Sequence, residues 1–125
     1  MPPSPLRRLR KLCLALPQAH EVEAWGEPTF RVKNKMFATF ANAASHHGRG
    51  RPAVWCKAQA VNQALLVRAA PERYFVPPYV GASGWVGAYL DDVVDWKELE
   101  GLLRDAYCLA APKRLARQVA PDSDA

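Results

Sequence analysis

Residues 21–41 read EVEAWGEPTFRVKNKMFATFA, and this stretch decides the fold. Polar and apolar residues alternate over 21–25 and again over 29–33, as in half-buried β-strands whose successive side chains point to opposite faces. Gly26-Glu27-Pro28 separates the first two strands. Asn34 tolerates positive φ and marks a tight turn before a third strand. Because Asn34 can share that turn with the residue before it or the residue after it, the hairpin register stays open.

Segments with helical periodicity lie before and after this strand region. Ser4-Pro5 is a helix start, and apolar residues follow at helical spacing until Pro17. Near the other end, Asp95 and Glu98 form the pattern of a capping box ahead of a long apolar helical face. Pro112 interrupts that helix, and residues 113–119 are predicted as a last basic turn or short helix.

Between these helices, the sequence predicts a further helix and three more strands. The helix covers residues 59–68 and the strands cover residues 52–57, 73–76 and 85–90, with Val54 and Cys56 facing opposite to Trp55. Strands that come in clusters favour a mostly antiparallel sheet. We therefore expect a two-layer α+β fold with the helices packed on one side of the sheet.

Composition indicates one ordered domain. The chain has 125 residues, half of them hydrophobic, so we expect a single domain over residues 1–125 with a frayed tail at 120–125. The three cysteines have no close pair, so Cys13 and Cys56 are predicted to be buried, reduced and unliganded. No secretory signal is recognisable and no apolar run approaches bilayer length, which favours a cytoplasmic protein without a membrane segment.

The net charge of +5 is unevenly distributed. Residues 1–57 carry ten Lys and Arg against three Asp and Glu, whereas residues 58–111 carry four against seven. A basic N-terminal half favours one polarised face that attracts polyanions. The alternative is that the basic side chains are scattered and serve only solubility.

Three motifs in order resemble the MmcQ/YjbR-like family. The first runs from Trp25 to Ala38, the second is Pro77-Pro78-Tyr79 followed by Gly84-Trp85-Val86, and the third closes the helix that ends before Pro112. Together with the first helix, the resemblance spans roughly residues 5–115. It implies a secretion-chaperone-like topology and DNA binding through projecting β-hairpins, a double wing. Residues 42–51 depart from the family pattern in being rich in His, Gly and Arg.

The strongest candidate surface is the hairpin over 29–41 with the loop after it. Basic side chains on a β-ribbon can contact phosphates and fit a groove. The alternative is the ordinary solvated face of an amphipathic hairpin. The candidate nucleic-acid-binding residues are Arg31, Lys33, Lys35, Arg49 and Arg51. A second basic stripe, Arg7, Arg8, Arg10 and Lys11, lies on the first helix and is either an extension of that surface or the wet side of the helix.

No motif of a catalytic, metal or cofactor site is present. His46-His47 lacks the spacing and partners of a metal site. Glu21, Glu23 and Glu27 have no accompanying nucleophile or oxyanion donor, so we expect no catalytic residues and no enzyme. The four tryptophans lie in or beside apolar patterns, and we expect all of them to be buried. Two hypotheses remain: weakly sequence-specific DNA binding, and a non-enzymatic interaction module for a protein partner or homodimer.

Overall fold

A computed structural model describes residues 4–42 and 50–119 of the chain. Its elements, in chain order, are α1 (Pro5–Leu14), β1 (His20–Ala24), β2 (Glu27–Val32), β3 (Lys35–Ala41), β4 (Ala53–Cys56), α2 (Ala60–Ala69), β5 (Tyr74–Phe75), the 3-10 helix η1 (Val80–Ser83), β6 (Val86–Tyr89), α3 (Trp96–Ala110) and α4 (Lys113–Val119). This order confirms the predicted sequence of helices and strands. Residues 43–49 and the predicted frayed tail lie outside the described ranges.

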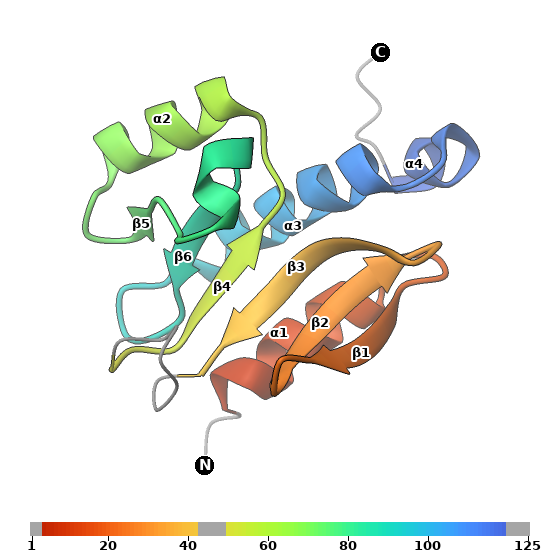
Figure 1. The fold of residues 1–125 in the computed structure, drawn as a ribbon, viewed down its shortest axis with the longest axis horizontal. Coiled ribbons are helices and arrows are strands. Elements are labelled where there is room, and N and C mark those ends of the chain that lie inside the picture. Colours follow the sequence, from red (N-terminus) through yellow and green to blue (C-terminus); the bar gives the residue numbers. More distant parts are fainter. Residues whose placement is uncertain (1–3, 43–49, 120–125) are drawn as a thin grey trace.

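The strands form one antiparallel sheet with the order β1-β2-β3-β4-β6-β5. Helices α1 and α3 lie side by side behind the sheet in Figure 1. Leu66 of α2 and Leu115 of α4 pack against the same core as α1 and α3. The prediction of an α+β fold with an antiparallel sheet and helices on one side is therefore confirmed.

Two-residue turns connect the first three strands. Ala24 pairs with Glu27 across the first turn, and Val32 pairs with Lys35 across the second. All four turn residues have positive φ: Trp25 54°, Gly26 77°, Lys33 50° and Asn34 65°. This is the primed geometry that matches the twist of paired strands.

These turns settle the open register and correct one boundary. The second turn uses Lys33 and Asn34, which decides between the two predicted alternatives. The predicted break at Gly26-Glu27-Pro28 is wrong, because the turn consists of Trp25 and Gly26 and the next two residues already belong to β2.

The core lies between α1, α3 and the inner face of the sheet. Phe30, Val32 and Phe37 are fully buried there, as are Leu99 and Leu103 of α3. Full burial of such a side chain stabilises the fold by about 1.5–3 kcal/mol relative to an exposed one. The inward direction predicted for Phe30 and Val32 is confirmed.

Tyr107 of α3 joins three parts of the fold. Its ring meets the ring of Phe37 edge-on, with the centroids 5.6 Å apart. Its hydroxyl donates a 2.6 Å hydrogen bond to the carbonyl of Pro17, in the segment between α1 and β1. An aromatic side chain that buries its ring and satisfies its hydroxyl in this way fixes both partners at once.

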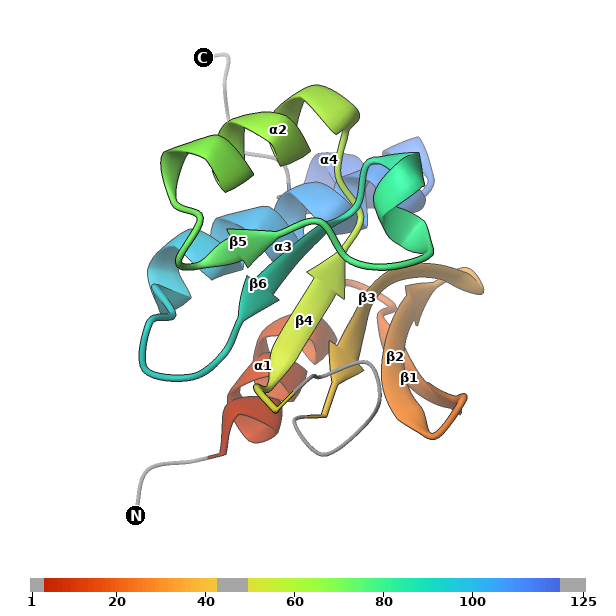
Figure 2. The same ribbon diagram turned by 60° about the vertical axis from the view of Figure 1, so that its left-hand side comes forward.

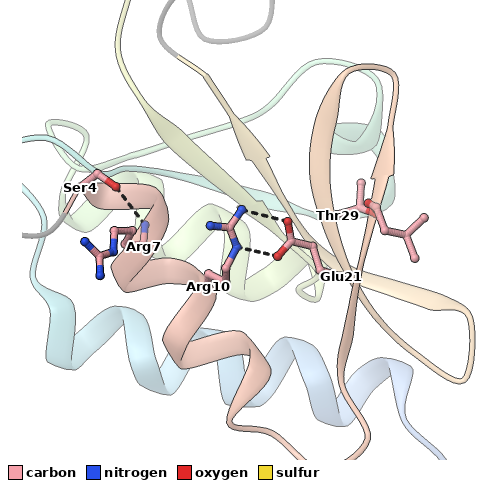
Figure 3. A network of polar contacts seen from close by, with 6 residues as sticks. Ser4, Arg7, Arg10, Glu21 and Thr29 are labelled. Carbon is pink, nitrogen blue, oxygen red and sulfur yellow. Dashed lines mark hydrogen bonds and ion pairs between the residues drawn. The ribbon is translucent and has the colours of Figure 1, made fainter.

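Polar contacts secure the two predicted helix starts and attach α1 to the sheet. Ser4 Oγ accepts a 3.2 Å hydrogen bond from Arg7 N, and Asp95 accepts one of 3.1 Å from Glu98 N. Arg10 holds Glu21 of β1 in a two-pronged ion pair, with Nε–Oε1 at 2.7 Å and Nη2–Oε2 at 3.0 Å (Figure 3).

The predicted burial of Cys13 and Cys56 is confirmed, and both are free thiols. Burial raises the pKa of Cys56 to about 12 and also raises that of Cys13, so both stay protonated at neutral pH. Within residues 4–42 and 50–119, no three His, Cys, Asp or Glu side chains are grouped as metal ligands would be. None of the helices in those ranges is long and apolar enough to cross a membrane.

We predict that Val32→Asp destabilises the protein by about 3–5 kcal/mol, because it places an unpaired charge in the core. Denaturant unfolding followed by circular dichroism measures the loss. Lys33→Asp, one residue further on in the exposed turn, is the matched control and should stay within about 0.5 kcal/mol of the wild type. Equal stability of the two variants would contradict the strand register.

A second prediction concerns Gly84, which has φ 95° after η1. A Cβ there would lie 2.9 Å from Ala60 N and 3.0 Å from Ala58 O, at the entrance to α2. We expect Gly84→Ala to cost at least about 1–3 kcal/mol. Gly101 in α3 has open space around it, so Gly101→Ala should instead stabilise the protein by about 1 kcal/mol. Thermal unfolding of both variants tests the opposite signs.

Candidate nucleic-acid interface

The β2–β3 turn presents two exposed basic side chains at one end of the sheet. Lys33 belongs to the turn itself, and Lys35 is the first residue of β3. Arg31 lies just before them and is only partly exposed, with its Nε donating a 3.1 Å hydrogen bond to Thr29 Oγ1. The register shift between Phe30 and Arg31 bends the pair of strands, β2 and β3, that carries the turn. Three of the predicted residues are thus brought together here.

Helix α4 adds basic side chains at the same end of the molecule. Lys113, Arg114 and Arg117 are exposed, while Leu115 is buried and anchors the helix. Burial raises the pKa of Tyr107, and the positive charge of Arg114 partly opposes that rise. Figure 1 shows α4 and the β2–β3 turn at the same end of the molecule. The sequence pattern indicates this basic segment but does not connect it with the hairpin.

Arg51, in contrast, lies at the far end of the strands. It precedes β4, whose first residue Ala53 pairs with Ala41, the last residue of β3. Arg51 is held by Asp91, with Nε–Oδ2 at 2.6 Å and Nη2–Oδ1 at 3.1 Å. Its guanidinium also lies 3.5 Å from the ring centroid of Tyr89. The predicted set therefore does not form one cluster, because antiparallel strands carry residues close in sequence to opposite ends.

Two other predicted features fall outside the described ranges. Arg49 belongs to residues 43–49, and so does the His46-His47 pair.

A second basic surface lies on the helical side of the molecule. A groove of about 790 Å³ runs between α1 and α3. The guanidinium of Arg8 lies 4.4 Å from the ring centroid of Trp96. The charged residues lining the groove are Arg7, Arg8, Arg10, Lys11, Lys97 and Glu100. The stripe predicted on the first helix thus combines with Lys97 of α3, which no sequence pattern connects with that stripe because only packing brings the two helices together.

Two of the three acidic residues considered for acid–base work have structural partners. Glu21 is paired with Arg10, and Glu27 is buried with Oε2 accepting a 2.8 Å hydrogen bond from Asn42 N. Glu23 is exposed on β1. The contacts of Glu21 and Glu27 hold α1 to β1 and the beginning of β2 to the end of β3.

The prediction that all four tryptophans are buried is wrong for Trp25. This residue is 82% exposed, whereas Trp55 and Trp85 are each 6% exposed and Trp96 is partly buried. Trp25 belongs to the β1–β2 turn, where the alternation of the strand no longer directs its side chain inward. The adjacent Gly26 was the available signal, since a glycine with positive φ is typical of such turns.

Comparisons with known proteins point to one family. The model of the YjbR family matches residues 14–109. A search of the curated proteins finds no match. The structure is similar to the crystal structure of the Deinococcus radiodurans protein DR2400, described as a DUF419 domain, with a TM-score of 0.74 and 23% sequence identity over 96% of this chain and 94% of that chain. The resemblance predicted from the three motifs is confirmed, and the structural neighbour shows the fold alone.

We predict that Arg51 stabilises the fold. The Arg51 guanidinium lowers the pKa of Asp91, so the pair contributes above the ordinary carboxyl pKa of about 4 and is lost as pH falls through the lowered value. Because the pair is partly exposed, Arg51→Gln should cost only about 0.5–1 kcal/mol at pH 7, and the difference should be smaller at pH 3. Lys35→Gln should change stability little at either pH. Urea unfolding at both pH values measures the pattern, and a pH-independent cost for Arg51→Gln would contradict it.

Proposed function

The chain belongs to the YjbR family, and on this premise we propose that it binds duplex DNA through phosphate contacts of the β2–β3 turn and α4. The observation that carries the proposal is that both elements carry exposed cations and lie at the same end of the molecule in Figure 1. They form the hairpin–α4 surface, which consists of Lys33, Lys35, Lys113, Arg114 and Arg117.

The charges of this surface are available to an external anion. The three ion pairs found within the described ranges are those of Arg10 with Glu21, Arg51 with Asp91 and Arg73 with Glu98. None of them involves the hairpin–α4 surface. Exposed cations that are not neutralised within the protein gain the most from phosphate, because each contact releases condensed counterions from the nucleic acid.

The shape of the surface favours phosphate contacts over base reading. A narrow turn with two lysines can enter or straddle a groove, and the neighbouring helix can contact the adjacent backbone. A lysine ammonium is a single point charge without the planar fork by which arginine recognises its partners, so the turn is better suited to phosphates than to base edges. The proposed binding is therefore weakly sequence-specific and strongly dependent on salt. It is non-catalytic and includes no metal or cofactor.

The α1–α3 groove supports a second location for the same function. The groove is lined by four cations, Arg7, Arg8, Lys11 and Lys97, and by one carboxylate, that of Glu100. Arg10 also lines it, but its charge is paired with Glu21. A duplex cannot enter a groove of this size, but its phosphates can lie along the rim. We place the principal contacts on the hairpin–α4 surface because its cations project from the fold rather than lining a depression.

Two variants of equal charge separate these locations. In the first, Lys33 and Lys35 are both replaced by Gln; in the second, Arg7 and Lys11 are both replaced by Gln, so each loses two positive charges. We predict that only the first weakens binding to unrelated duplexes and flattens the slope of log affinity against log salt by up to about 1.8, or about 0.9 per lost contact. Fluorescence anisotropy with labelled duplexes over a series of salt concentrations measures both quantities.

Three results would overturn the proposal. Absence of wild-type binding even at low salt would leave the interaction-module hypothesis in its place. Equal losses in the two variants would mean that net charge, not a defined surface, attracts DNA. Loss in the second variant alone would move the interface to the α1–α3 groove. Both variants change exposed residues, so unfolding should not obscure the comparison.

A further inference from the structure

Strand β1 forms one edge of the sheet and pairs with β2 on one side only. It lies along the margin of the sheet in both Figure 1 and Figure 2. Its five residues make it the longer of the two edge strands, since β5 has only two. The free side of an edge strand presents backbone N–H and C=O groups without strand partners, which are a template for another extended chain. The proposed DNA surface does not include this strand.

The register between β1 and β2 decides which backbone groups of β1 face outward. The two-residue turn makes Ala24 and Glu27 a hydrogen-bonded pair, and bonded and non-bonded pairs alternate from there along the ladder. Glu23 lies opposite Pro28, which has no N–H, as expected at a non-bonded position. The N–H and C=O of Glu23, and those of Glu21 two residues earlier, therefore point away from β2. Apart from the strand ladder, no backbone hydrogen bond found in residues 4–42 and 50–119 involves these four groups.

The side chains of β1 give its two faces different chemistry. Glu21 and Glu23 share the inner face, where Glu21 is paired with Arg10 and Glu23 is exposed. Val22 points to the outer face and is 37% exposed. Trp25 follows in the β1–β2 turn and is 82% exposed. A strand added beside β1 would therefore meet an exposed carboxylate on its inner side and exposed apolar groups on its outer side.

We propose that β1 binds an extended peptide segment as an added strand, and that this segment carries Lys or Arg opposite Glu23 with an apolar residue on either side of it. Hydrogen bonds to the outward backbone groups of Glu21 and Glu23 supply affinity, and alternate side chains supply specificity. The basic side chain lies on the same face as the Glu23 carboxylate. Its apolar neighbours lie on the outer face, opposite Val22 and Ala24, and cover the exposed surface there.

Charge argues against a second copy of this chain as the occupant. If β1 paired antiparallel with β1 of a second copy and used all four outward groups, Glu21 of each copy would lie opposite Glu23 of the other. Like charges directly opposite each other destabilise paired strands. Charged side chains on an edge strand are a common protection against such self-pairing. The same carboxylates favour a segment of opposite charge.

The test uses a capped peptide, TVKVKVT, in which lysines alternate with valines. The matched peptide TVEVEVT has the same length and apolar residues but the opposite charge. Binding is followed by two-dimensional NMR titration of the amide signals of Glu21 and Glu23. We expect the lysine peptide to bind at least about tenfold more tightly than the glutamate peptide and to protect both amides from hydrogen exchange. Because the chain has a net charge of +5, general attraction would favour the glutamate peptide instead.

Backbone methylation of the lysine peptide tests the added strand directly. Opposite Glu21 and Glu23, the lysine N–H groups face β1, whereas the N–H of the central valine faces away. Methylation of one lysine nitrogen should therefore weaken binding at least about tenfold. Methylation of the central valine nitrogen, the matched control, should change binding little.

Two protein variants of equal charge change locate the recognition. Glu23→Lys should reverse the preference, so that the glutamate peptide binds more tightly than the lysine peptide. Glu72→Lys makes the same change at an exposed residue outside β1 and should keep the wild-type preference. Both positions are exposed, so loss of folding should not obscure the comparison. Neither belongs to the hairpin–α4 surface, so the result is independent of DNA binding.

Four results would overturn the proposal. Equal binding of the lysine and glutamate peptides would remove the charge recognition. Equal effects of the two methylations would show that backbone pairing with β1 does not hold the peptide. Concentration-dependent protection of the Glu21 and Glu23 amides in the free protein would mean that a second copy covers the edge. Absence of binding by the lysine peptide would refute this class of partner.

Discussion

The packing of α3 across the inner face of β3 and β4 is the interaction on which the rest of the structure depends. Leu99, Leu103 and Tyr107 of α3 are buried against this face. Tyr107 also reaches Phe37 of β3 and the carbonyl of Pro17. Its two contacts position the start of β3 and the segment leading into β1 relative to one helix. Helix α4 comes directly after α3, so the same packing decides where its basic residues lie.

The two faces of the sheet are bordered by different elements. The helices occupy the inner side of the sheet, and the short η1 and the β1–β2 hairpin border its outer side. Each strand pair then has two ends with different chemistry. The β2–β3 turn and α4 are basic, whereas the opposite end carries Glu23 and Glu27 together with Arg51, which is paired with Asp91. A net charge of +5 conceals this separation, because charges of both signs cancel in the sum but not on the surface.

The three motifs of the family resemblance have physical roles in the fold. Trp25-Gly26 forms a primed turn, and the residues after it begin β2. Pro77 and Pro78 accept hydrogen bonds from the start of η1, and Gly84 lies where a side chain would meet the backbone before α2. The third motif contains Tyr107. Much of the sequence that identifies the family therefore consists of residues that form the fold. Fold alone does not determine function.

The sequence by itself determined the local structure: helix starts at Ser4 and Asp95, the strand alternation that buries Phe30 and Val32, and the buried cysteines. These follow from periodicity and capping, which act over a few residues. The sequence left the β2–β3 register open and wrongly predicted that Trp25 is buried. The reason is that a shift of one residue at a turn moves a side chain to the other face of the strand. Tertiary structure alone decided that Arg51 pairs with Asp91, 40 positions away, and that Lys97 joins the basic stripe of α1. It also brought Trp25, Met36, Trp55 and Tyr79, from four separate segments, around one pocket. Such pairings depend on how strands and helices pack, and no pattern within one segment encodes the identity of a partner in another.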